Sequence, residues 1–186
     1  MEFILRPARP ADAEEIMRVM HTAMAGLKDE AWFAPDDAAY IRAHIDGPEG
    51  FCLVAEAQEA GKHPLAAYFT VKLAGTAPDA LGRILHMTEK ELACTAQMDS
   101  CCVAPPYQGN GLEGRLLLAA EERLKAMPYR HYLATVHPDN AASLYTGLHR
   151  GYRIAAENVR CYGGKLRVVL QKDRPDDTQT KEENTV

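Results

Sequence analysis

The sequence has no excess of positive charge, no long apolar run and no recognisable export signal. Its 186 residues include 21 lysines and arginines against 26 aspartates and glutamates, which gives a formal net charge of −5. A basic surface for nucleic acid is therefore not expected. No apolar stretch approaches the roughly 18 to 20 residues that a membrane-spanning helix needs, and residues 1–6 are too short and too soon charged for a signal peptide. We expect a cytoplasmic protein with neither nucleic-acid nor membrane partners.

Paired cysteines and nucleophile motifs are also missing. The five cysteines include no Cys-x-x-Cys pair, so neither a metal site nor a redox dithiol is expected. Most of them lie in apolar, strand-like segments, which is typical of buried free thiols in a reducing compartment. No Gly-x-Ser-x-Gly elbow is present, and the adjacent Cys101 and Cys102 fall in a predicted buried strand. The sequence therefore gives little support to a covalent enzyme intermediate.

The hydrophobic pattern predicts one domain of alternating helices and strands. Apolar residues make up 47% of the chain and charged residues 25%, an ordinary globular mixture. We expect strands at 3–7, 51–55, 65–73, 96–103, 132–136, 152–155 and 166–170, and helices at 10–25, 38–45, 111–127 and 140–150. The segment 74–93 is expected to be irregular or helical. Residues 1–171 then form a single α/β sandwich with a mixed sheet, and 172–186, poor in large apolar residues, form a disordered tail.

A glycine-rich loop between a predicted strand and helix is the most informative segment. Pro105-Pro106 is followed by Gln108-Gly109-Asn110-Gly111, and then by Gly114. Glycines let successive backbone N–H groups approach an anion, and the start of the helix adds its positive end. The loop lacks the lysine of a Walker A motif and the glycine spacing of a dinucleotide fold. It indicates a phosphate site, although a tight turn without a ligand would have a similar pattern.

The stretch from Val103 to Leu112 resembles motif A of the GNAT (Gcn5-related N-acetyltransferase) superfamily, whose core is Arg/Gln-x-x-Gly-x-Gly/Ala. Gln108 and Gly111 occupy the first and fourth places of that core. Glu113 stands at the sixth place, where the family usually has glycine or alanine. A carboxylate there would repel a pyrophosphate unless it turned towards solvent.

Residues 140–152 resemble motif B of the same superfamily, which often reads Asn-x-x-Ala/Ser-x-x-Leu-Tyr-x-x-x-Gly-Phe/Tyr. Asn140, Ser143 and the pair Gly151-Tyr152 fit this pattern. The tyrosine of the motif, which in many members protonates the CoA sulfur, is replaced here by Gly147. The resemblance extends over roughly residues 3–172 and is most specific from 98 to 152.

The resemblance implies a three-layer sandwich with a mixed, mostly antiparallel sheet flanked by helices. It implies direct transfer of an acetyl group from acetyl-CoA to a small-molecule or peptide amine, without a metal, in a protein that can be a homodimer. The residues that it assigns to acetyl-CoA are Cys102, Val103, Gln108, Gly109, Asn110, Gly111, Leu112, Glu113, Gly114, Asn140 and Ser143. Asn140 would bind the pantetheine arm, and it can equally serve as the N-cap of its helix.

Two catalytic residues are candidates by position. Asp99, on the strand before the loop, can act as general base, although ordered water serves in many relatives and a structural aspartate would look the same. Tyr145 is the nearest substitute for the missing tyrosine at position 147, but it lies two residues away and should leave the helix from another face. The alternative is that Tyr145 packs at the edge of the core.

Trp32, Phe33 and Asp36 lie in the segment that borders the acceptor site in this superfamily, and they could receive a cationic amine. A hydrophobic plug followed by a helix cap is the alternative interpretation. For the whole chain, an acyl-CoA-binding sensor without turnover is the competing function, favoured by Glu113 and Gly147. A phosphate-binding fold of another family remains possible only if the motif B pattern is coincidental.

Overall fold

A computed structural model of the protein describes residues 1–175, the side chain of residue 46 excepted. The order of elements is β1 (Phe3–Pro7), α1 (Ala13–Ala25), α2 (Ala38–Asp46), β2 (Gly50–Ala57), β3 (Leu65–Lys72), α3 (Glu89–Ala93), β4 (Thr95–Val103), α4 (Leu112–Lys125), β5 (His131–Val136), α5 (Ala141–His149), β6 (Arg153–Cys161) and β7 (Lys165–Asp173). Short 3-10 helices lie at Pro10–Asp12, Glu30–Trp32, Leu81–Leu85 and Pro105–Tyr107. None of the described helices combines the length and apolarity needed to cross a bilayer.

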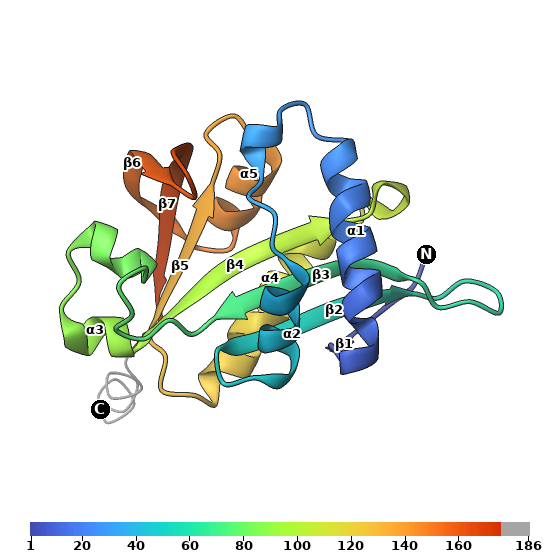
Figure 1. Ribbon diagram of the computed structural model, residues 1–186, viewed down its shortest axis with the longest axis horizontal. Helices are drawn as coiled ribbons and strands as arrows, with labels where there is room; N and C mark the ends of the chain where they lie inside the picture. Colours follow the sequence, from blue (N-terminus) through green and yellow to red (C-terminus); the bar gives the residue numbers. More distant parts are fainter. Residues whose placement is uncertain (176–186) are drawn as a thin grey trace, which may run out of the picture.

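The strands form one seven-stranded sheet in the order β1-β2-β3-β4-β5-β7-β6. Among the described strands, only the neighbours β4 and β5 run parallel. Helices α1 and α2 lie on one face and α4 and α5 on the other (Figure 1). The central strands β2 and β3 are buried almost throughout, as expected for strands covered on both faces. The structure is therefore the three-layer, mostly antiparallel sandwich that the sequence resemblance implied.

Two irregularities in β4 open the centre of the sheet. The pairing of β4 with β5 ends at Met98 and Ala134, although β4 continues to Val103. On its other side, Ser100 pairs with Thr70 and Met98 pairs with the next residue of β3, which leaves Asp99 as the extra residue of a β-bulge. Bulges bend a strand and redirect a side chain, and they are frequent beside active sites. The edge of β4 that faces β5 consequently has no strand partner over residues 99–103.

Most predicted elements are present, with differences at the ends of β6 and β7. The segment 74–93 was expected to be irregular or helical, and it contains a 3-10 helix and the short helix α3, which begins at a capping box formed by Thr88 and Glu91. Strand β6 continues to Cys161, well past the predicted end at 155. Strand β7 ends at Asp173, and the guanidinium of Arg174 donates to the carbonyl of Lys125 at 3.1 Å. The expected start of the tail at 172 is therefore too early. Residues 176–186 lie outside the described part of the chain.

Candidate active site

The loop before α4 presents a row of free backbone N–H groups. Gly109 and Gly111 have φ values of +78° and +66°, and Gly111 is the N-cap of α4 without any side-chain cap. A Cβ at either glycine would meet no atom within 4 Å, so the loop is open on this side. Within residues 1–175, no acceptor bonds to the N–H groups of residues 109–114. Such N–H groups at the start of a 14-residue helix form an anion site without a cationic side chain.

The side chain of Asn110 holds this loop in shape from within. Its amide donates to the carbonyls of Tyr107 at 3.0 Å and Gln108 at 3.3 Å. Gln108 in turn donates from its side-chain amide to the carbonyl of Val103 at 3.3 Å. These side chains therefore orient the loop, and its N–H groups remain available to a ligand.

Glu113 lies in the first turn of α4 and is partly buried. Its side chain lies in the space between α4 and α5, where burial raises the pKa of the carboxyl and a hydrogen bond with Ser143 lowers it. Raised pKa values favour the neutral form of a buried carboxyl. The carboxyl therefore interacts with α5 through Ser143, and its repulsion of a pyrophosphate stays a prediction.

Asn140 is the N-cap of α5, the structural role that its position in the sequence also allowed. The Oδ1 atom of Asn140 accepts from the backbone N–H of Ser143 at 3.3 Å and caps the helix. Gly147 faces the buried Leu170, and a Cβ at this position would lie 2.6 Å from the Leu170 Cδ1 atom. A tyrosine at position 147 therefore does not fit the present packing.

Three neighbouring cavities with shared lining residues lie along the opening between β4 and β5. A cavity of about 790 Å³ is lined by the 109–114 loop together with Cys102, Val103, Asn140 and Ser143. A second, of about 660 Å³, lies on the other side of Trp32 and Phe33 and reaches Asp36 and Asp99. A slot of about 110 Å³ shares lining residues with both, among them Asp99 and Glu113. Most of the predicted cofactor and acceptor residues thus line these neighbouring cavities, which together we call the passage.

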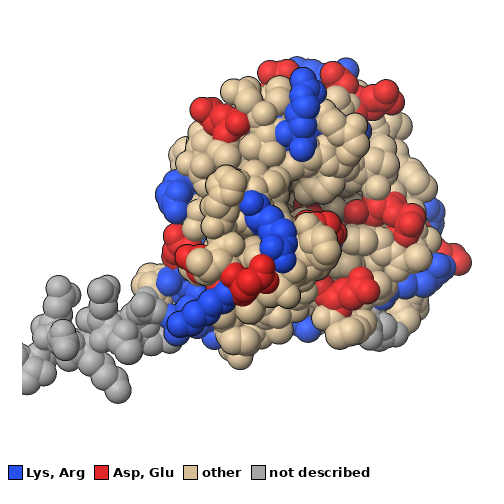
Figure 2. Space-filling view, turned by 60° about the vertical axis from the view of Figure 1, so that its left-hand side comes forward, with Lys and Arg blue, Asp and Glu red and all other residues tan. Residues whose placement is uncertain are grey.

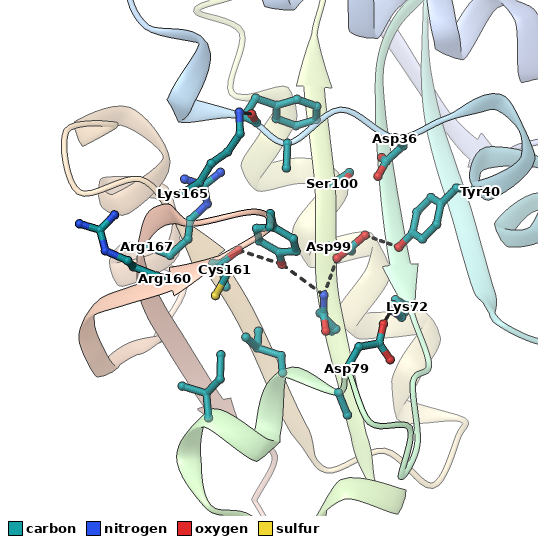
Figure 3. A pocket seen from close by; sticks show the side chains of 18 of the residues that line it. Asp36, Tyr40, Lys72, Asp79, Asp99, Ser100, Arg160, Cys161, Lys165 and Arg167 are labelled. Carbon is teal, nitrogen blue, oxygen red and sulfur yellow. Dashed lines mark hydrogen bonds and ion pairs between the residues drawn. The ribbon is translucent and has the colours of Figure 1, made fainter.

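The second cavity contains two carboxyl groups close to one another. The hydroxyl of Tyr40 and the amide of Gln97 donate to Asp99, the latter at 2.5 Å (Figure 3). Burial raises the pKa of Asp36 to about 7, the charge of Asp99 contributes in the same direction, and a hydrogen bond from Ser100 opposes both. The Asp36 Oδ2 atom is buried without a hydrogen-bond partner in the described chain. Asp36 is thus poised to exchange a proton near neutral pH.

The helix cap expected near Asp36 is made by Asp37, at the start of α2. The Asp37 carboxylate accepts from the backbone N–H of Tyr40 at 2.7 Å and caps α2. Asp36 is therefore available to the cavity. Trp32 stacks on His137 with ring centroids 6.1 Å apart, and together with Phe33 it covers the slot.

Tyr145 does not pack at the edge of the core. It is 61% exposed and stacks on His149, with ring centroids 3.7 Å apart. Its ring lines the cofactor-side cavity, whereas Gly147, two residues later, lines the slot. The expectation that these two positions leave α5 from different faces is therefore confirmed.

The thiols near the passage are poorly suited to nucleophilic attack. All five cysteines are free. Burial raises the pKa of Cys102 to about 12 and that of Cys101 well above the usual range. Because the thiolate is the reactive form, neither is activated. Among the described residues, no three His, Cys, Asp or Glu side chains are grouped so that they could hold a metal ion.

Several residues of the acceptor-side cavity were not predicted from the sequence: Tyr40, Gln97, Ser100, Arg160, Tyr162, Lys165 and Arg167. One signal was readable, because Lys165 and Arg167 are two residues apart and therefore share a face of β7. Figure 2 shows a hollow in the surface of the protein, with acidic and basic side chains around it. The other residues come together only through the sheet and the bulge.

Comparisons with known proteins agree with this geometry. The model of the family described as "Acetyltransferase (GNAT) family" matches residues 15–151. Comparison with curated proteins gave no match.

Among solved structures, a putative acetyltransferase from Salmonella typhimurium with acetyl-CoA has a TM-score of 0.69 at 19% identity, covering 95% of this chain and 96% of that one. The ribosomal-protein-S18-alanine N-acetyltransferase of Escherichia coli has a TM-score of 0.66 at 16% identity, covering 94% and 96%. The PaiA N-acetyltransferase of Thermoplasma acidophilum with coenzyme A has a TM-score of 0.65 at 17% identity, covering 93% and 99%. At these identities the structures show a common fold.

The family model spans most of the chain and includes the free N–H cradle, the opening between β4 and β5, and the cap at Asn140. The protein is thus an N-acetyltransferase that uses acetyl-CoA, and it belongs to the acetyltransferase (GNAT) family.

Proposed function

We propose that acetyl-CoA occupies the cofactor-side cavity and that a primary amine enters from the opposite cavity to meet the acetyl group in the slot. The observation that carries this proposal is the passage itself, with an anion cradle at one end and carboxyl groups at the other. The relatives crystallised with acetyl-CoA and with coenzyme A support it. The transfer is direct, because neither buried thiol at the passage is activated.

The cofactor would be held mainly by backbone groups. Its pyrophosphate would accept from the N–H groups of residues 109–114, and the pantetheine arm would pair with the open edge of β4 near Cys102 and Val103. The Asn140 amide N–H group would add a hydrogen bond to the arm, because only its Oδ1 atom is used in capping α5. An N–H group of the same strand edge would polarise the thioester carbonyl.

Asp36 and Asp99 together would act as the general base. The incoming ammonium must lose a proton before its nitrogen can attack the thioester carbon. Burial and the nearby charge of Asp99 raise the pKa of Asp36 to about 7, so Asp36 can take up this proton near neutral pH. The kcat/KM value should therefore rise with pH up to about 7 and then level off. A profile that stays flat from pH 5 to 8 would remove this pair from the mechanism.

Glu113 is our candidate for the general acid in place of the missing tyrosine. As the C–N bond forms and the C–S bond breaks, the leaving thiolate needs a proton. Burial raises the pKa of the Glu113 carboxyl, which favours its protonated form, and the side chain lines both the slot and the cofactor cavity. Tyr145 remains the alternative acid from the cofactor side.

The assay that tests the proposal combines calorimetry with acetyl-CoA and detection of released CoA thiol over a panel of amines, with mass spectrometry of the products. Binding together with amine-dependent thiol release is expected. Absence of binding at millimolar acetyl-CoA would contradict the proposed cofactor site, and binding without turnover of any amine would contradict the proposed role of the carboxyl pair.

We also propose a cytoplasmic location, supported by the five free cysteines. A homodimer is a further expectation from the family resemblance, and light scattering on the purified protein tests it. A monomer across the micromolar range would contradict it.

A further inference from the structure

The acceptor-side cavity has walls of opposite charge. Asp36 and Asp99 lie on one side, at the start of α2 and on β4, and three cations come from the hairpin of β6 and β7 on the other (Figure 3). These are Arg160, Lys165 and Arg167. The carboxyl pair accounts for an amine, but nothing in the transfer reaction itself requires the cations.

Other basic residues of this cavity are already neutralised. Lys72 pairs with Asp79 at 2.6 Å, and Arg83 pairs with Glu89 at 3.0 Å. In contrast, no carboxylate of the described chain pairs with the three hairpin cations. Lys165 donates to the carbonyls of Glu30 and Phe33, which fixes the loop over the slot.

Arg167 is the most unusual of the three because it is only 3% exposed. Its Nη1 atom donates to the carbonyls of Ala31 at 2.9 Å and Leu166 at 2.7 Å, and its guanidinium lies 5.6 Å from the centroid of the Tyr162 ring. Its Nε and Nη2 atoms have no partner within the described residues. A buried cation without an anion is costly, and a guanidinium is shaped to bind an oxyanion with two parallel hydrogen bonds.

Tyr162 stands between the two charged walls. Its hydroxyl is 3.3 Å from the Thr135 hydroxyl and 3.5 Å from the Gln97 amide, which itself donates to Asp99. Its ring extends towards Arg167. The residue has a φ of +48°, and such backbone strain in a non-glycine residue is frequent at functional sites. Two glycines follow it at the tip of the hairpin, so the turn places this ring in the cavity.

We propose that the acceptor is a small amine that also carries an anionic oxyacid group, such as the carboxylate of an amino acid. The amine would face Asp36 and Asp99, and the oxyanion would bind Arg167, with Tyr162 packed against the part between them. A cavity of about 660 Å³ is of a size that encloses a small molecule. This inference rests on the proposed function and narrows its acceptor class.

The test compares matched amines in the thiol-release assay with the full-length protein. L-phenylalanine is compared with L-phenylalaninamide and phenethylamine, L-methionine with L-methioninamide, and O-phosphoethanolamine with ethanolamine. The anionic member of at least one set should have a kcat/KM roughly 10- to 100-fold higher, the range that a hydrogen bond to a charged group provides. The sets also distinguish a carboxylate from a phosphoryl group. Equal or better turnover of the uncharged members would overturn the inference and leave the proposed function intact.

Variants locate the effect. Arg167→Gln should remove the preference for the anionic acceptor and leave its amide almost unaffected, and Arg167→Lys should retain part of the preference. The matched control is Arg153→Gln, because Arg153 is an exposed arginine on the same hairpin that pairs with Asp173 at 3.5 Å. Calorimetry with acetyl-CoA shows whether each variant is folded. A folded Arg167→Gln protein that still prefers the anionic acceptor would overturn the assignment of Arg167 as the oxyanion site. A wild-type protein that does not bind acetyl-CoA would instead refute the proposed function.

Discussion

Replacing Asp36 by asparagine should stabilise the protein, and the gain should depend on pH. Burial raises the pKa of Asp36 from 3.8 to about 7. At a pH between these two pKa values, the Asp36 carboxyl has lost its proton in the unfolded chain and keeps it in the folded chain. The folded state therefore loses stability as the pH rises from about 4 to about 7, and the full loss is present above 7. Asparagine is neutral at every pH and avoids this loss.

The magnitude follows from the difference between the two pKa values. At about 1.4 kcal/mol for each pH unit, it amounts to roughly 4 kcal/mol as an upper value, because relaxation around the charged carboxylate reduces it. For a domain of this size, 1 kcal/mol changes Tm by about 2 to 4 °C. Asp36→Asn should therefore raise Tm by several degrees at pH 8 and by much less at pH 5, while it lowers kcat.

Urea unfolding of both proteins at pH 5, 6, 7 and 8 measures this difference. The matched control is Asp139→Asn, because the side chain of Asp139 is 78% exposed, and it should change stability little at any pH. A variant that is no more stable than the wild type at pH 8, or that gains equally at pH 5 and pH 8, would refute the reasoning. Asp36 would then be an ordinary solvated carboxylate and a poor base near neutral pH.

Three further predictions concern the cofactor side. Gly111→Ala should weaken acetyl-CoA binding about tenfold or more in calorimetry, because strain at positive φ distorts the N–H cradle. The control Gly61→Ala has a similarly positive φ, in the turn between β2 and β3 and outside the lining of the cofactor-side cavity, so it should cost similar stability and leave binding unchanged. Equal affinities in both variants would count against the cradle. Glu113→Gln should lower kcat at least tenfold with little effect on acetyl-CoA affinity, and Tyr145→Phe should lower kcat less. If steady-state kinetics show the larger loss of kcat in Tyr145→Phe, the tyrosine is the acid. Gly147→Ala should lower the free energy of unfolding by about 1 to 3 kcal/mol because the added methyl group overlaps a buried leucine, and an unchanged urea midpoint would show that the leucine moves aside.

Local features of the sequence were sufficient for most elements and for the conformation of the glycine-rich loop. The spacing of apolar residues predicted most helices and strands, and the glycines at 109 and 111 have the positive φ values that their loop was expected to need. The segment 74–93 is irregular and helical as expected, whereas the length of β6 was missed. In β6, two register shifts and a positive φ at Asn158 interrupt the strand, so its sequence lacks the regular alternation by which strands are recognised.

The acceptor side could be predicted only in part, because it depends on contacts between distant segments. Asp99 was named from its place before the loop, but the bulge that turns it towards Tyr40 arises from its pairing with β3. Asp36 and Asp37 look alike in the sequence, and only the folded helix shows that Asp37 is the cap. The hydrogen bond between Glu113 and Ser143 likewise joins two different helices.

The sequence by itself determined the order of elements, the conformation of the glycine-rich loop and the family resemblance, because glycine conformation, helix caps and hydrophobic periodicity act over a few neighbouring residues. Only the tertiary structure decided which charges share the acceptor cavity, since sheet register and burial bring Asp36, Asp99 and Arg167 together from three separate segments. Burial also sets the pKa of Asp36, and burial is a property of the packed molecule that no short stretch of sequence contains.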